Sequence, residues 1–108
     1  MVLRVAPPLH EGTVVSKADR RQVLRQAEHL INGKRAAEYG EPVDNFRRIA
    51  NLWTAYLDGK TELDEADAAI MQGLIKVARL RETKAHWDSW VDLAGYAASG
   101  WSAVVDSD

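Results

Sequence analysis

The feature that most constrains the fold of this chain is the spacing of its apolar side chains, which recur every three to four residues in four separate segments. That spacing is the period of an α-helix that buries one face. No segment alternates convincingly with the period of two that is typical of a half-buried strand. The sequence therefore predicts an all-α protein whose helices lie near residues 17–31, 44–57, 64–81 and 87–99.

The same spacing predicts which side of each helix faces the core. For the third helix the predicted buried stripe is Ala66, Ile70, Gly73, Leu74, Val77 and Ala78. For the fourth it is Trp90, Val91, Ala94, Ala97 and Ala98, and Gly100 is expected to end that helix, with Trp101 folded back onto the bundle. A glycine inside a helix costs about 1 kcal/mol relative to alanine. Gly73 therefore predicts a close approach by a neighbouring helix.

The length of 108 residues indicates one domain or one subunit. Pro7, Pro8 and Gly12 oppose helix, so residues 1–15 are predicted to form a flexible arm and residues 16–108 a single helical domain. Short loops favour a four-helix bundle with antiparallel neighbours. Four amphipathic helices of this size leave a limited core, and small residues suit close contacts between subunits, so a homo-oligomer is predicted.

Charge and composition bear on the partners of the chain. The net charge is −2, with about +3 on residues 1–60 and −5 on residues 61–108, which suits docking between helices or subunits but not a nucleic-acid partner. No apolar run approaches the roughly 20 residues of a membrane span, and the first residues lack the apolar stretch of a secretion signal. The chain has no cysteine, hence no disulfide or thiolate metal site. The expected location is the cytoplasm.

Acidic and basic side chains next to the apolar faces of the third and fourth helices mark the predicted site. Ionised groups at a core edge cost free energy unless they are paired, hydrated or bound to a ligand. Asp88 and Asp92 lie one turn apart and could jointly hold Mg²⁺, which prefers oxygen ligands. The alternative is that Asp88 caps the fourth helix while Asp92 pairs with a cation across the bundle.

The third helix carries two basic side chains that could take part in an ion pair or in ligand binding. Lys76 and Arg79 lie three residues apart and could pair with Asp92 or bind phosphate oxygens. Asp67 is either a favourable charge in the first helical turn or a metal ligand. Trp87, beside a loop, is the tryptophan expected to be available for stacking on a base, and Tyr39 lies in a turn that could border the same site.

Four segments of the chain suggest a family. They are Asn32-Gly-Lys-Arg-Ala-Ala-Glu-Tyr-Gly40, Asn45-Phe-Arg-Arg-Ile-Ala-Asn-Leu-Trp53, Leu74-Ile-Lys-Val-Ala-Arg-Leu80 and Asp88-Ser-Trp-Val-Asp-Leu-Ala-Gly-Tyr96. In this order, over about residues 20–100, they resemble a small domain family of bacteriophages and prophages whose function is not established. That family is in turn distantly similar to the MazG-like, all-α nucleoside triphosphate pyrophosphatases.

The resemblance implies a helical bundle that oligomerises in a bacterial host cell. It also implies Mg²⁺ held by helix-borne acids, and hydrolysis of a nucleotide between its α and β phosphates. In such a protein, Asp67, Asp88 and Asp92 of this chain would hold the metal, Lys76 and Arg79 would offset the phosphate charge, and Tyr39 or Trp87 could contact the base.

The chain also departs from the pyrophosphatase pattern, which leaves three functions open. Glu62 and Glu65 have the expected spacing but lie at a helix start, and Lys76 and Arg79 stand where carboxylates would be preferred. The first function is a Mg²⁺-dependent pyrophosphohydrolase. The second is a non-catalytic protein that sequesters a signalling nucleotide of host defence. The third is a helical protein-interaction module without a small ligand.

Overall fold

The computed structural model describes residues 19–33, 37–38 and 40–107. Over these residues the chain forms four long helices and no strand: α1 (Arg20–Asn32), α3 (Pro42–Tyr56), α4 (Glu65–Glu82) and α5 (Trp87–Asp106). The all-α prediction is confirmed. The predicted arm, residues 1–15, lies outside the described residues.

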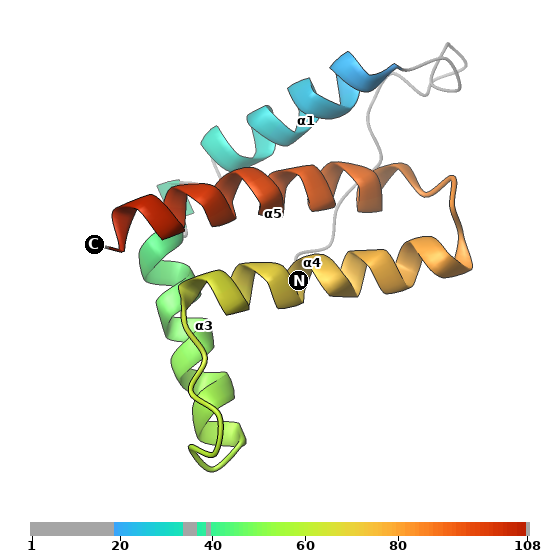
Figure 1. Cartoon of the computed structure of the whole chain (residues 1–108). Helices are drawn as coiled ribbons and strands as arrows, with labels where there is room; N and C mark the ends of the chain where they lie inside the picture. Colours follow the sequence, from blue (N-terminus) through green and yellow to red (C-terminus); the bar gives the residue numbers. More distant parts are fainter. Residues whose placement is uncertain (1–18, 34–36, 39, 108) are drawn as a thin grey trace.

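The helices are arranged around α5, which contacts each of the other three (Figure 1). α4 runs antiparallel beside it after a short turn, α1 packs on its opposite side, and α3 crosses the other end of the α4–α5 pair. α1 makes its main contacts with α5 rather than with α3 or α4. The predicted four-helix bundle is thus open in a single chain, because its helices do not all surround one core.

α1 begins at Arg20, three residues after the predicted start, and α4 begins at Glu65, close to the predicted start. Asp19 caps α1, where its carboxylate accepts from the backbone N–H groups of Arg21 and Gln22 and the Gln22 side chain accepts from the Asp19 N–H. Asp64 and Asp67 form the same reciprocal arrangement at the start of α4. Such capping boxes satisfy N–H groups that the helix leaves without partners.

α3 begins earlier than predicted, whereas α5 begins at the predicted residue, Trp87, but with a different cap. α3 starts at Pro42, two residues before the predicted start at residue 44, because the fixed φ of proline suits the first helical position. α5 is capped by His86 and not by Asp88: the His86 Nδ1 accepts from the Ser89 backbone N–H at 3.2 Å. Asp88 lies in the first turn, where a negative charge is favourable.

Gly100 does not end α5, which continues to Asp106. A Cβ atom at position 100 would lie 3.0 Å from the Cβ of Ala69, so this glycine serves the close approach of α4 and α5. Gly73 of α4 also faces α5, but a Cβ there would make an ordinary van der Waals contact, 3.4 Å from Leu93 Cδ1. Trp101 consequently stays in the helix, 67% exposed, and does not fold back as predicted.

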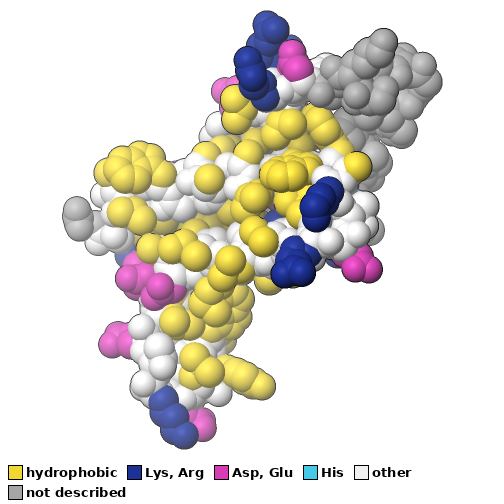
Figure 2. Space-filling model, turned by 45° about the vertical axis from the view of Figure 1, so that its right-hand side comes forward, with side chains coloured by type: hydrophobic (Ala, Val, Ile, Leu, Met, Phe, Trp, Pro, Cys, Tyr) yellow, Lys and Arg dark blue, Asp and Glu magenta, His cyan; other side chains and the backbone are white. Residues whose placement is uncertain are grey.

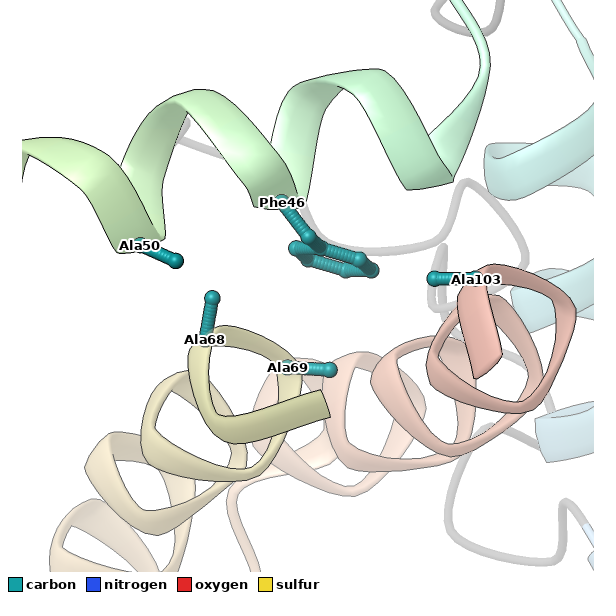
Figure 3. Close-up of a cluster of buried hydrophobic side chains, with 5 residues drawn as sticks. All are labelled: Phe46, Ala50, Ala68, Ala69 and Ala103. Carbon is teal, nitrogen blue, oxygen red and sulfur yellow. The ribbon is translucent and has the colours of Figure 1, made fainter. Parts of the chain in front are cut away.

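The core of the described chain lies where α3 meets the α4–α5 pair. Figure 3 shows the Phe46 side chain between its alanine neighbours from all three helices. These neighbours are Ala50, Ala68, Ala69 and Ala103. The Phe46 ring also lies 6.5 Å from the ring of Tyr96, centroid to centroid. One large side chain among alanines lets three helices approach closely, but it makes the core small.

The predicted buried stripe of α4 is largely wrong. Ile70 and Leu74 are 61% and 58% exposed, and Val77 is also exposed. The buried positions of α4 are instead Ala68, Ala69, Gly73, Lys76 and Leu80. Apart from Lys76 and Leu80, the buried positions are small residues, which allow the close approach described above, whereas Ile70, Leu74 and Val77 are exposed.

Arg47 ties α3 to the start of α4. Its Nε lies 2.7 Å from Glu65 Oε2. A hydrogen bond from the Glu65 backbone and then the Arg47 side chain hold the pKa of the Glu65 carboxyl below its ordinary value. Both interactions favour the ionised carboxylate.

A lowered pKa links Glu65 to the stability of the fold in acid. The unfolded chain takes up the proton at a higher pH than the folded chain does, so the stabilisation is present at neutral pH and lost as the pH falls through the folded pKa. In urea unfolding we expect wild type to lose about 0.5–1 kcal/mol more than Glu65→Gln between pH 6 and pH 3. Equal losses would show that the pair contributes nothing.

Candidate functional site

The predicted site contains a buried ion pair between α4 and α5. Lys76 Nζ lies 3.1 Å from Asp92 Oδ2, and the two side chains are 11% and 6% exposed. The prediction that Asp92 is buried and paired with a cation is confirmed. Because each charge is removed from water, each depends on the other for compensation. The pair therefore acts first as a structural link between the two central helices.

The three acids predicted to hold Mg²⁺ are not brought together in one chain. α4 and α5 run antiparallel, with Ala69 beside Gly100, so Asp67 lies at one end of the pair and Asp88 at the other. Along α4, Asp67 and Lys76 are separated by about 13 Å. Among the described residues, no three Asp, Glu or His side chains are placed to hold a metal ion.

The residues predicted to bind a nucleotide have different surroundings. Lys76 is buried against Asp92, while Arg79 is exposed on α4. Trp87 is half-buried rather than exposed, and its indole N–H is buried without a hydrogen-bond acceptor among the described residues. Tyr39 lies outside the described residues. The structure thus assembles the ion pair of the predicted site and leaves Arg79 and Trp87 beside the turn between α4 and α5.

An open apolar groove of about 520 Å³ runs between α4 and α5, and sequence reasoning missed it. Its walls are formed by large side chains, and Gly73 and Gly100 lie between them. The larger lining residues are Ile70, Leu74 and Val77 of α4 and Leu93, Trp101 and Val104 of α5. A phosphate group needs several hydrogen-bond donors, which this lining does not offer. The groove is suited to another apolar surface.

The groove belongs to a wider apolar surface. Thirteen large apolar side chains are exposed in the described part of the chain, and nine of them lie on α4 and α5. In the described part of the chain, the only large apolar side chains that are buried are those of Phe46, Leu80 and Val91. Figure 2 shows hydrophobic side chains spread across one face of the molecule, over α4 and α5 and onto α3, with Lys and Arg at its edge. Soluble monomers rarely expose a contiguous apolar patch of more than a few hundred Å².

None of the helices that the structure describes has both the length and the hydropathy needed to cross a bilayer.

Two proteins of mycobacterial phages are similar to this chain. The Gene 55 protein of Mycobacterium phage L5 is 48% identical over 75 residues, which cover 69% of this chain and 47% of the phage protein. The Gene 55 protein of Mycobacterium phage D29 is 43% identical over 75 residues, covering 69% and 48%. The chain thus spans about half the length of these relatives. No solved structure matches it.

The match to a known family covers all of α3 and α4 and most of α1 and α5. The model of the family described as "Domain of unknown function (DUF6378)" matches residues 22–103. Together with the Gene 55 proteins, this match confirms the predicted phage domain family; the more distant similarity to MazG-like enzymes stays a prediction. The chain belongs to the DUF6378 family.

Proposed function

We propose that this chain is a helical association module that binds a second copy of itself through the exposed apolar face of α4 and α5. The observation that carries the proposal is the orientation of α4. Its small residues pack inside the chain, whereas Ile70, Leu74 and Val77 face outward. Amphipathic helices normally turn their larger apolar residues toward a core. A partner surface would complete the missing half of that core.

The exposed apolar area fits a dimer interface. An aliphatic side chain carries about 60–120 Å² of apolar surface and an aromatic one about 150–250 Å². The nine exposed side chains of α4 and α5, two of them tryptophans and most near half exposure, therefore offer roughly 500 Å². Since homodimer interfaces are about 65% apolar, this corresponds to roughly 800 Å² per subunit, the size of a standard stable interface.

Sedimentation equilibrium of the purified chain tests this association. We expect wild type to sediment at twice its mass of 12.0 kDa at micromolar concentration. Leu74→Glu should sediment as a monomer, because a buried, unpaired carboxylate opposes the apolar contact. The matched control is Leu52→Glu on α3, where the leucine is 68% exposed and outside the groove; this variant should remain dimeric. A monomeric wild type would overturn the proposal.

Nucleotide binding is the second candidate, and one surface feature favours it. Arg79, Arg81 and Lys84 are exposed around the turn between α4 and α5, where Trp87 and Trp90 also lie. The Trp90 indole donates to the Lys84 carbonyl at 2.7 Å. Guanidinium groups bind phosphate oxygens well, and tryptophan rings stack on bases. This combination supports a protein that holds a nucleotide without cleaving it, such as one that sequesters a signalling nucleotide.

A fluorescence titration with a panel of nucleotides, with and without Mg²⁺, tests the second candidate. Because Lys76 already compensates Asp92, we expect any binding to be independent of Mg²⁺. Arg79→Ala should weaken it about tenfold, since one charge-assisted hydrogen bond contributes roughly 1.5 kcal/mol, whereas Arg25→Ala on α1 should not. Release of pyrophosphate with Mg²⁺ would instead support a MazG-like pyrophosphohydrolase. If no nucleotide binds, self-association is the only one of the two proposed functions that remains.

A further inference from the structure

The exposed face of α4 carries a heptad spacing with a charge at each end. Asp67, Ile70, Leu74, Val77 and Arg81 follow one another at intervals of three, four, three and four residues. This is the spacing of side chains along the seam of a two-helix coiled coil. The three central positions are apolar and exposed, while the first is acidic and the last basic. The seam can therefore pair with another helix, and its two ends carry opposite charges.

We infer that two copies pair with their α4 helices antiparallel, about a two-fold axis between Leu74 and Val77, so that Arg81 of each subunit reaches Asp67 of the other. This inference rests on the proposed self-association and adds its geometry and its specificity residues. An interface with two-fold symmetry uses the same residues on both subunits. In this register Leu74 of one subunit lies opposite Val77 of its partner, and Ile70 lies opposite Arg81.

The charges decide between the two directions of pairing. A parallel pair would place Asp67 against Asp67 and Arg81 against Arg81, so both ends would repel. An antiparallel pair brings the acid of each chain within one turn of the base of the other chain, at both ends, and also opposes the two helix dipoles. The stem of Arg81 would cover Ile70 while its guanidinium reaches Asp67, one turn further along. The charge pattern thus favours a second copy in one orientation.

The surroundings of Asp67 suit an arginine from outside the chain. Asp67 Oδ2 accepts the backbone N–H of Asp64 at 3.0 Å, which holds the carboxylate in place. Trp101 lines the groove at this same end of α4, where Ala69 meets Gly100, and its ring is exposed. A guanidinium between a carboxylate and the face of a tryptophan gains from both contacts. The end of the groove can therefore receive Arg81.

Charge reversal tests the register. Arg81→Asp should raise the dimer dissociation constant at least tenfold, because it places two acids together at both ends of the seam. Arg79→Asp is the matched control, since Arg79 is exposed on α4 but outside the heptad positions and the groove; it should leave the constant unchanged. Combining Arg81→Asp with Asp67→Arg should restore the dimer, although the capping box at the start of α4 is lost.

Disulfide trapping gives a second readout, because the natural chain has no cysteine. A disulfide needs Cα atoms about 4.4–6.8 Å apart. When Leu74→Cys and Val77→Cys chains are mixed and oxidised, the antiparallel register predicts disulfides between the two kinds of chain. Disulfides formed mainly within each kind would overturn it, as would failure of the charge swap to restore the dimer. If these register tests fail but wild type is a dimer that Leu74→Glu dissociates, the proposed self-association is supported and only this register is wrong. If wild type is a monomer, both proposals are wrong.

Discussion

Replacing Asp92 with alanine is expected to lower the free energy of unfolding by about 3–5 kcal/mol, the range for breaking a buried pair by removing one partner. The reason is that Lys76, with its side chain 11% exposed, would keep its charge without a counterion between α4 and α5. For a domain of this size such a loss corresponds to a fall in Tm of more than about 12 °C. Thermal and urea unfolding, at one fixed protein concentration because association contributes to stability, measure it.

Two control variants separate the ion pair from other effects. Asp106→Ala removes an exposed acid from the same helix and should change stability by less than about 0.5 kcal/mol. The double variant Lys76→Met with Asp92→Leu replaces both charges by apolar groups of similar volume, and it should regain most of the lost stability. A melt of Asp92→Ala that matches wild type would show that the pair does not support the fold. Loss of nucleotide binding in that same stable variant would assign Asp92 to a ligand site.

Replacing Phe46 with alanine is expected to cost about 3–5 kcal/mol as well. Phe46 is 3% exposed and is the only aromatic side chain that is buried in the described chain. Its buried neighbours are alanines on three different helices, and larger, partly buried side chains such as Trp53 and Tyr96 also pack against the cluster. Because alanines cannot refill the space left by a phenyl ring, most of the transfer and cavity cost should appear. Urea unfolding of the variant, with circular dichroism to check its helicity, gives the value.

The control for Phe46→Ala is Leu52→Ala on the same helix. Leu52 is exposed, so this truncation should change stability by less than about 0.5 kcal/mol. If both variants lost similar small amounts, the alanine-lined cluster would not be the core of the protein, and the stability of the chain would have to come from contacts elsewhere.

The candidate site could be predicted only in part, because its chemistry depends on how α4 and α5 are aligned. The spacing of charges beside apolar faces indicated that Asp92 would need a cation, and Lys76 was one of the two expected. Which acids lie near each other follows instead from the alignment of Ala69 with Gly100. That alignment separates Asp67 from Asp88. No local pattern reports such an alignment, since it is set by contacts between residues about 30 positions apart.

The sequence by itself determined those features of the fold that depend on neighbours within a few residues. The all-α class follows from the period of the apolar residues, and the start of α4 near residue 64 follows from the acids that cap it. Each of these depends on hydrogen bonds and burial within one helix.

Only the tertiary structure decided which side of α4 faces the core, where α5 ends and what each buried charge contacts. α4 has apolar or small residues around most of its circumference, so periodicity alone allows more than one inner face. Close packing favours small residues between the helices, because a Cβ at position 100 would already lie 3.0 Å from the Cβ of Ala69, which leaves no room for a larger side chain there. In this packing α5 continues through Gly100 to Asp106, and the larger apolar side chains of α4 are exposed.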